Sequence, residues 1–353
     1  MCLLRKAPMF RHGAPELSTV IIDAYNADVR DRSGFVGDRA NSQVLRAQIE
    51  EWRQRLRLQG EDDPFGNILP AALTKKKLGR ILSYGEPRAA ALVHSAVEEF
   101  GGKLAEVIRL FLKMPTWHQT DLIVVGGGFC ASRLGKLAIS RTDLLLKADG
   151  IDVKLRPIHF HPDEAGLVGC AHLVPRWMFA GHRAILAVDI GGSKLRAGLI
   201  ELNLETAADL SAATVLKSAI WRHGSTEADR DAIVARMIEM LERLLQYAEK
   251  HDIAVAPFVG IGCPGLISAD GEIKHGSQNL PGDWEANEFK LPERIAEQLP
   301  SIGNHPTTVI MHNDAVVQGL SERPFAAEFE HWAILTVGTG LGNAHFSTRP
   351  KPD

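Results

Sequence analysis

The sequence has few cysteines and no closely spaced pair of them. Among 353 residues there are four cysteines, Cys2, Cys130, Cys170 and Cys263, and none belongs to a C-x-x-C pair. This spacing argues against a disulfide framework and against a cysteine zinc site. We therefore expect buried thiols in a reducing compartment.

Long apolar runs are also missing. No run approaches the roughly 18 residues of a membrane span. The start, Met1 to His12, contains Pro8 and several basic residues. It lacks the apolar core of roughly 7–15 residues that a secretion signal needs. The expectation is a soluble, cytoplasmic protein without a membrane partner.

No charge of one sign dominates. The chain has 40 Lys and Arg against 43 Asp and Glu, a formal net charge of -3, which gives no argument for a nucleic-acid partner. The Walker signature G-x-x-x-x-G-K-S/T is absent as well, which argues against a P-loop enzyme. A 45% hydrophobic content is ordinary for globular proteins, and the length suits two domains.

What the sequence does contain is a glycine turn between two strand-like segments. Residues 184–188 and 195–202 are short and apolar, and Asp189-Ile190-Gly191-Gly192-Ser193-Lys194 joins them. We expect a β-hairpin whose turn brings backbone N–H groups, a hydroxyl and an ammonium group to an anion, while Asp189 holds a water-bound Mg²⁺. A plain tight turn after a strand-end acid is the alternative.

A second segment repeats this shape about 150 residues later. Leu335-Thr336-Val337 leads into Gly338-Thr339-Gly340-Leu341-Gly342-Asn343, again strand, glycine turn and strand. Repetition at this distance predicts two lobes derived from one unit, whose two hairpins grip a phosphate chain.

Polar residues follow two further strands. Asn313 and Asp314 end the apolar segment 307–311, where Asp314 could accept the proton of an attacking hydroxyl or, alternatively, cap the next helix. Asn279 and Asp283 lie in a loop with Pro281-Gly282, which forms either a polar pocket for hydroxyl groups or an ordinary turn.

The apolar segment 121–126 runs into Gly126-Gly127-Gly128, typical of a central parallel strand with a ligand at its carboxyl end. Gly126 to Ala131 formally matches the dinucleotide fingerprint. The fingerprint also requires an acidic residue about 20 positions further on, and Asp149 is the candidate. Asp149 precedes the next expected strand, whereas in a Rossmann unit this acid lies at the end of the second strand.

The remaining pattern alternates strands and helices. We expect a loose tail over residues 1–16 and polar loops over 28–41 and 59–70. Strands are expected over residues 17–25, 150–158, 214–221 and 257–263. Helices are expected over residues 44–58, 74–83, 86–113, from 129 to 147, from 163, 226–251, up to 299 and from 315.

Together these motifs resemble the ROK family of sugar kinases in the actin, Hsp70 and hexokinase superfamily. Asp189 to Lys194 resembles the family's first phosphate motif, Gly338 to Gly342 its second, Gly126 to Gly128 its adenosine motif and Asn313-Asp314 its catalytic aspartate. Gly262-Cys263-Pro264-Gly265 and Asn279-Leu280-Pro281-Gly282 resemble its sugar-side loops. The resemblance is strong over residues 185–343, moderate over 86–173 and weak before that.

The resemblance implies an α/β, two-lobed, actin-like (ribonuclease H-like) fold with a cleft between the lobes. In the family, the triple glycine and a closing helix that resembles residues Asp163 to Leu167 follow the second phosphate motif. Here both precede the first phosphate motif, so the chain resembles a circular permutant. The implied lobes are residues 1–165 completed by 323–353, and residues 166–322.

One family feature has no counterpart. A Gly-His followed by three clustered cysteines binds zinc in the family, and the histidine and a nearby glutamate contact the sugar; nothing here matches. The loop 28–41 occupies the corresponding place, and its residues are left unassigned.

The resemblance implies an ATP-dependent hexose kinase with Asp314 as general base, Mg²⁺ near Asp189, and a sugar held by Pro264, Gly265, Asn279 and Asn313. It is compatible with a homodimer and leaves open which sugar is used and whether ATP or polyphosphate is the donor. A sugar sensor without catalysis is one alternative, although the start of the chain shows no DNA-binding helix-turn-helix. An NAD-dependent oxidoreductase built on Gly126 to Ala131 is the other.

Overall fold

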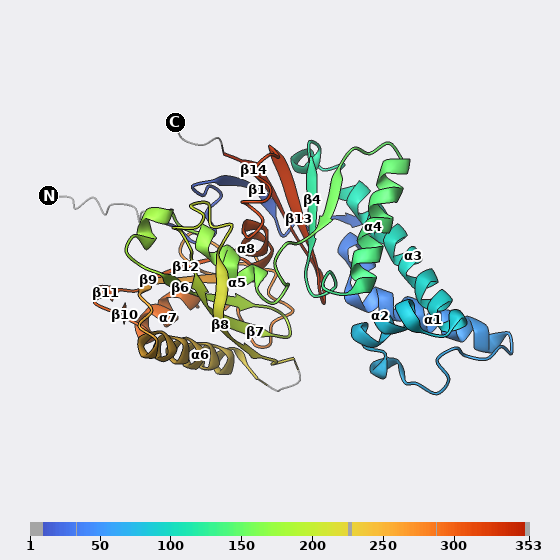
Figure 1. The fold of residues 1–353 in the computed structure, drawn as a ribbon. Coiled ribbons are helices and arrows are strands. Elements are labelled where there is room, and N and C mark those ends of the chain that lie inside the picture. Colours follow the sequence, from blue (N-terminus) through green and yellow to red (C-terminus); the bar gives the residue numbers. More distant parts are fainter. Residues whose placement is uncertain (1–9, 33, 225–227, 287, 350–353) are drawn as a thin grey trace. The chain divides into compact units, whose positions relative to one another are not determined.

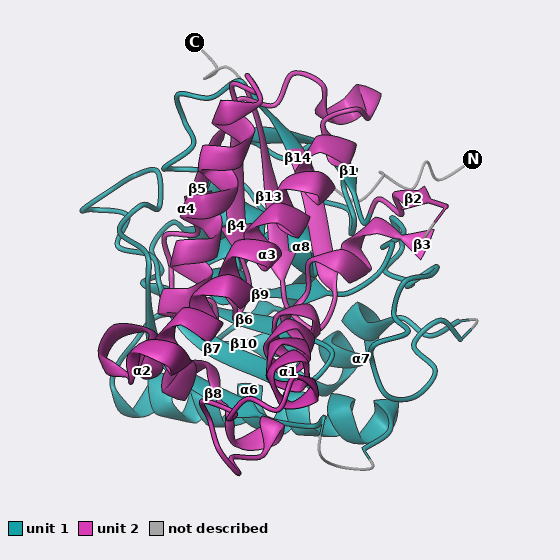
Figure 2. Ribbon diagram, turned by 90° about the vertical axis from the view of Figure 1, so that its right-hand side faces the viewer, with its two compact units in different colours: residues 1–26, 163–330, 346–353 teal, residues 27–162, 331–345 magenta. Residues whose placement is uncertain are grey.

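The computed structural model describes residues 10–32, 34–224, 228–286 and 288–349. The chain divides into two compact units, each assembled from segments far apart in the sequence (Figure 2). Unit 1 comprises residues 1–26, 163–330 and 346–353, and unit 2 comprises residues 27–162 and 331–345. The lobe boundaries suggested by the family resemblance, after residues 165 and 322, stay a prediction.

Unit 1 is built on a five-stranded mixed sheet. Its strands, in spatial order, are β12 (Thr308–Asn313), β9 (Val255–Cys263), β6 (Ala184–Ile190), β7 (Leu195–Glu201) and β8 (Thr214–Trp221) (Figure 1). β6, β9 and β12 are parallel, whereas β7 is antiparallel to both β6 and β8. The expected β-hairpin around Gly191 to Lys194 is therefore present.

Helices cover both faces of this sheet. They are α5 (Ala165–Gly169), α6 (Arg230–Lys250), α7 (Leu291–Gln298) and α8 (Asp314–Leu320), with a small pair of strands, β10 (Ser301–Ile302) and β11 (His305–Pro306). Ala184, Leu186, Val188 and Ile190 share one apolar cluster with α6 and α7. Since side chains alternate along a strand, Asp189 points to the opposite face, where α5 packs.

The second sheet is also five-stranded. Its spatial order is β1 (Val20–Tyr25), β14 (Leu341–Thr348), β13 (His331–Val337), β4 (Leu122–Gly126) and β5 (Lys154–Pro157). β13, β4 and β5 are parallel. All five residues of β4 are buried, as expected for a central parallel strand.

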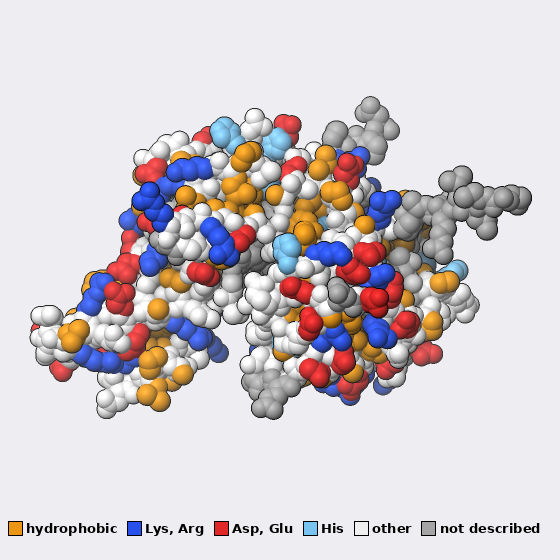
Figure 3. Space-filling view, turned by 180° about the vertical axis from the view of Figure 1, so that it is seen from behind, with side chains coloured by type: hydrophobic (Ala, Val, Ile, Leu, Met, Phe, Trp, Pro, Cys, Tyr) orange, Lys and Arg blue, Asp and Glu red, His pale blue; other side chains and the backbone are white. Residues whose placement is uncertain are grey.

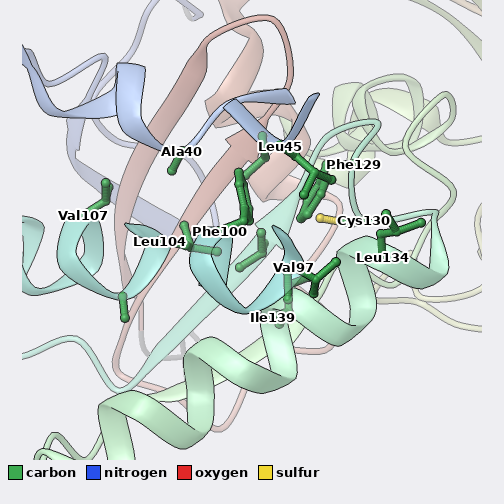
Figure 4. Packing of buried hydrophobic residues seen from close by; sticks show 14 of the residues in the cluster. Ala40, Leu45, Val97, Phe100, Leu104, Val107, Phe129, Cys130, Leu134 and Ile139 are labelled. Carbon is green, nitrogen blue, oxygen red and sulfur yellow. The ribbon is translucent and has the colours of Figure 1, made fainter. Parts of the chain in front are cut away.

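Four long helices belong to unit 2. They are α1 (Ser42–Leu58), α2 (Lys75–Tyr84), α3 (Pro87–Phe111) and α4 (Arg133–Ala148). A pair of two-residue antiparallel strands, β2 (Arg30–Asp31) and β3 (Gly34–Phe35), precedes them. Figure 4 shows the core between α3, α4 and the sheet, in which the rings of Phe100 and Phe129 lie 4.7 Å apart. This apolar core fixes the turn that carries Gly126 to Gly128.

The start of the chain differs from expectation. Residues 1–9 lie outside the described residues, but residues 10–16 are not a loose tail. Gly13 N donates to Met311 O over 2.9 Å, and Glu16 forms a β-bridge with Ile21. Elsewhere the expected elements are present, with β1 and β5 shorter than expected. Residues 225–227, at the expected start of the helix 226–251, are outside the described ranges.

The cysteines and the charged side chains are distributed as the composition predicts. Cys130, Cys170 and Cys263 are buried, unpaired thiols. Figure 3 shows acidic and basic side chains interspersed over the face it presents.

Among the described residues, no helix combines the length and the apolar character that crossing a membrane requires.

Candidate functional site

The carboxyl ends of three parallel strands bring the predicted acids together. Asp189 on β6 is in register with Gly262 on β9, and Asn313 on β12 with Cys263. A Cβ on Gly262 would lie 3.6 Å from Asp189 Oδ1 and 3.6 Å from Asp314 Cα. Asp189 and Asp314 thus flank one glycine at the edge where open α/β sheets bind ligands.

Asp189 is held by a network of charges that the sequence did not reveal. It is only 2% exposed, and its Oδ2 accepts from Arg196 Nη1 over 2.9 Å. Arg196 also donates through Nε and Nη2 to Asp163 Oδ1, over 2.9 and 2.6 Å. Lys194 Nζ lies 3.1 Å from the same oxygen. The predicted phosphate-binding cation is therefore already paired with a carboxylate.

Burial and these charges act in opposite directions on the acids. Burial raises the pKa of Asp189, although Arg196 opposes the shift. For Asp163 burial also acts upward, but the hydrogen bonds and charges of Arg196 and Lys194 outweigh it and lower the pKa. Asp163 therefore stays ionised beside the two cations.

Asp314 is the first residue of α8, and its neighbour performs the capping. Asn313 Oδ1 accepts from Ala315 N and Val316 N over 2.9 and 3.3 Å, and Asn313 Nδ2 donates to Gly265 O over 3.0 Å. Asp314 is half-buried. Burial, reinforced by the charge of Asp189, raises the pKa of Asp314 to about 7. A group with this pKa can exchange protons near neutral pH.

The first glycine turn is supported from outside the hairpin. Gly191 N donates to Lys194 O over 2.9 Å, and His223 Nε2 lies 2.9 Å from Gly191 O. Gly224 N donates to Ser193 O over 3.2 Å. His223 and Gly224, which follow β8, were not predicted, because no local motif marks them.

The sugar-side loops lie next to this turn. A Cβ on Gly192 would be 3.1 Å from both the Cβ and the carbonyl oxygen of Asn279, whose side chain is exposed. Gly265, after half-buried Pro264, has φ +103° and faces His275 O. Asp283 is exposed, and its carboxylate accepts from Glu285 N over 3.1 Å in a local turn. The two loops and the first phosphate motif thus meet within unit 1.

Unit 2 joins the other two predicted motifs. Gly127 has φ +82°, and a Cβ there would lie 2.5 Å from Val337 O, directly before Gly338. In the second turn Gly338 N donates to Gly340 O over 2.9 Å, and half-buried Gly342 is the second residue of the return strand β14. Lys75 Nζ donates to Gly128 O over 3.1 Å, which adds a cation that sequence reasoning missed. The triple glycine and Gly338 to Gly342 form one glycine-lined region.

Two other predicted features have structural roles. In the loop 28–41, Asn41 caps α1 through Gln43 N and Val44 N, Arg30 pairs with Asp28, and Arg39 with Asp31. Asp149 ends α4 and pairs with Arg109. It therefore does not stand at the end of a second strand, where a dinucleotide-binding acid belongs.

Within the described residues, no three side chains of the His, Cys, Asp and Glu types are grouped in a metal-binding arrangement.

Comparisons with known proteins agree with the motifs. Residues 185–348 match the model of the ROK family. A glucokinase of Thermotoga maritima is 29% identical over 160 residues, which are 45% of this chain and 43% of the relative. The chain thus spans less than half the length of this curated relative.

Solved structures give weaker likenesses. Lmo2764 of Listeria monocytogenes, described as a candidate N-acetylmannosamine kinase, is 23% identical with a TM-score of 0.33, covering 46% of this chain and 47% of that one. A candidate sugar kinase of Cytophaga hutchinsonii is 20% identical with a TM-score of 0.35 and the same coverages. Both TM-scores are below 0.5.

The resemblance to the ROK family is thereby confirmed for residues 185–348. The predicted α/β class is confirmed by the two mixed sheets and their helices, and the match to the ROK model agrees with the predicted actin-like type of fold over residues 185–348. The roles of individual residues stay proposals.

Proposed function

We propose that this protein transfers a phosphoryl group from MgATP to a hydroxyl of a hexose, with Asp314 as general base. The observation that carries the proposal is a half-buried carboxyl at the end of β12 whose pKa is about 7. Such a group is ionised often enough near neutral pH to accept the proton of the attacking hydroxyl. This contribution is typically worth about 10²- to 10⁴-fold in rate.

Backbone turns supply the phosphate contacts in this proposal. In unit 1, Gly191 to Lys194 presents N–H groups, the Ser193 hydroxyl and the Lys194 ammonium. Asp189 Oδ1 faces Gly262, so an oxygen ligand is available for Mg²⁺ through water. When bound, the ion would neutralise charge on the phosphates. In unit 2, Gly338 to Gly342 and the triple glycine beside Lys75 offer further nucleotide contacts.

Unit 1 also supplies the proposed sugar contacts. Asn279 is exposed beside Gly192, and Pro264 and Gly265 form the loop bonded to Asn313. Both polar ends of Asn313 are used by the protein, so its role is to position Asp314 and Gly265. The name of the Thermotoga relative suggests glucose as the first substrate to try.

We further propose that the chain is a circular permutant of the family's order. With each set of strands numbered from its glycine hairpin, the first sheet reads β8, β7, β6, β9, β12, that is 3-2-1-4-5. The second reads β1, β14, β13, β4, β5, again 3-2-1-4-5. In the second sheet, however, strands 3, 4 and 5 come before strands 1 and 2 in the sequence. A cut inside the second repeat, between its strands 2 and 3, with the old ends of the chain joined, accounts for this difference.

The test is the Asp314→Asn variant, assayed by sugar-dependent release of ADP over glucose, mannose, fructose and N-acetylated hexosamines. We expect at least a 100-fold loss of kcat with unchanged affinity for MgATP, because the amide cannot accept the proton. Turnover close to that of the wild type would refute the role of Asp314. Binding of sugar without any turnover by the wild type would support a sensor instead.

A further inference from the structure

The first described residues of the chain are hydrogen-bonded to β12, the strand that directly precedes Asp314. Met311 N donates to His12 Nδ1 over 3.1 Å. Burial lowers the pKa of His312 to about 4, so its ring is neutral at pH 7. His312 Nδ1 accepts from Asn313 N over 2.7 Å, and Nε2 therefore carries the proton and donates to Ala14 O over 3.1 Å.

The same segment then reaches the loop that follows Gly265. The Tyr25 hydroxyl accepts from Ile267 N over 3.3 Å and lies 3.4 Å from Ile267 O, to which it donates. Its ring packs edge-on against His312, with centroids 5.1 Å apart. β1 is thereby fixed against both β12 and the sugar-side loop, all within unit 1.

Asn26, directly after β1, lies against Gly276, which in turn lies close to Gly265 of the proposed sugar site. A Cβ on Gly276 would be 2.7 Å from Asn26 Nδ2 and 3.1 Å from Gly265 Cα. Gly265 O in turn accepts from Asn313 Nδ2 over 3.0 Å. A continuous set of contacts thus leads from the Asn26 amide to the residue beside Asp314.

The state of Asn26 differs from that of an ordinary loop residue. Its φ is 51°, a left-handed conformation that is strained for most residues. Within the part of the chain that the structure describes, its half-buried amide makes no hydrogen bond. An amide offers both a donor and an acceptor, which matches sugar hydroxyls.

We propose that Asn26 is a specificity-determining residue. It hydrogen-bonds one hydroxyl of the sugar substrate, whose reacting hydroxyl loses its proton to Asp314. This inference rests on the proposed function. It places a sugar contact directly after β1, at a position that no recognised motif marks. The loop 28–41 is not proposed for this contact, because Asp28, Asp31 and Asn41 are already engaged in ion pairs or helix capping.

The decisive variant is Asn26→Gly. Glycine adopts positive φ without strain, so the fold should be kept while the amide is lost. We expect the KM or Kd for the preferred sugar to rise about tenfold, the worth of about one hydrogen bond, with the KM for ATP unchanged. Asn26→Asp, which keeps an acceptor but no amide donor, should change the ranking of sugars in the same panel.

Asn203→Gly is the matched control. Asn203 also belongs to unit 1 and has φ 48°, but its Nδ2 donates to Ala212 O over 2.9 Å, away from the sugar-side loops. It should change stability at most and leave the KM for sugar unchanged.

Three results would overturn the inference. The first is that both Asn26 variants keep the wild-type KM for sugar and the wild-type ranking of sugars, while Asp314→Asn still abolishes phosphoryl transfer. That result would refute the role of Asn26 and leave the proposed function intact. An equal rise in the KM for ATP would show a general structural role. If the wild-type protein neither phosphorylates nor binds any sugar of the panel, the proposed function fails and the inference fails with it.

Discussion

At the scale of the residue, ionisation of Asp314 as the pH rises should increase activity and decrease the stability of the fold. Its folded-state pKa of about 7 lies above the ordinary value of 3.8, so folding favours the protonated form. The resulting stability is complete below about pH 4 and is lost as the pH rises through 7. We therefore expect Asp314→Asn to be more stable than the wild type, by an amount that grows by about 2 kcal/mol between pH 5 and pH 8. Chemical denaturation at both pH values measures it.

The same pKa predicts the activity profile. The wild-type kcat should rise with pH through about 7, as the general base becomes ionised. Asp62→Asn is a suitable control, because Asp62 is exposed and belongs to none of the site motifs, so it should change neither the stability difference nor the profile. A stability difference between Asp314→Asn and wild type that is flat from pH 5 to pH 8 would contradict the raised pKa.

Single residues also show where sequence reasoning reaches its limit. Asp314 and Asp189 were found because an acid at the end of an apolar strand is unusual. The choice between capping and catalysis for Asn313-Asp314 was open in sequence, because both types of residue cap helices well. The structure shows that Asn313 caps the helix, whereas the catalytic role of Asp314 stays a proposal. Asp163, His223 and Lys75 act through partners distant in sequence, which no local pattern encodes.

At the scale of the element, α5 and α8 cross closely enough that only glycine fits between them. A Cβ on Gly169 would lie 1.7 Å from Val317 O, which belongs to the helix that begins with Asp314. We expect Gly169→Ala to lower the free energy of unfolding by about 1–3 kcal/mol, since backbone must move to admit the methyl group. Thermal unfolding followed by circular dichroism tests this.

The control for this overpacking is Gly102→Ala in α3. No atom lies within 4 Å of a Cβ at Gly102, so alanine should be neutral or stabilise the helix by up to about 1 kcal/mol. Equal effects of the two substitutions would argue against close packing of α5 on α8.

Elements with strong periodicity or clear end signals were predictable, including both glycine hairpins and the long helices. The position of residues 10–16 was not, because their pairing with Met311 is set by a strand roughly 300 residues away and their composition carries no periodicity. The meeting of Gly192 with Asn279, and of Gly127 with Val337, likewise depends on tertiary packing. The motifs could be identified in sequence, whereas their contacts could not.

At the scale of the whole molecule, the proposed permutation predicts that the chain can be restored to the family's order. Arg349 N donates to Thr19 O over 3.1 Å, so the last described residue of the chain lies next to the residue that precedes β1 in unit 1. Joining residue 353 to residue 1 leaves residues 350–353 and 1–9 as the connection. New ends fit between Gly181 and His182, where φ +79° and open space mark an exposed turn. Compact folds usually tolerate such a change.

This rearranged chain should fold with the same circular dichroism spectrum and phosphorylate the same sugar with a similar kcat, because every strand keeps its neighbours in both sheets. A chain with the same joint but opened inside β4, between Val124 and Val125, is the matched control. It should fail to fold, because that strand is buried between β13 and β5. If the first rearrangement failed as completely as the second, the connection at residues 175–183 would be essential to the fold rather than the joint of a permutation.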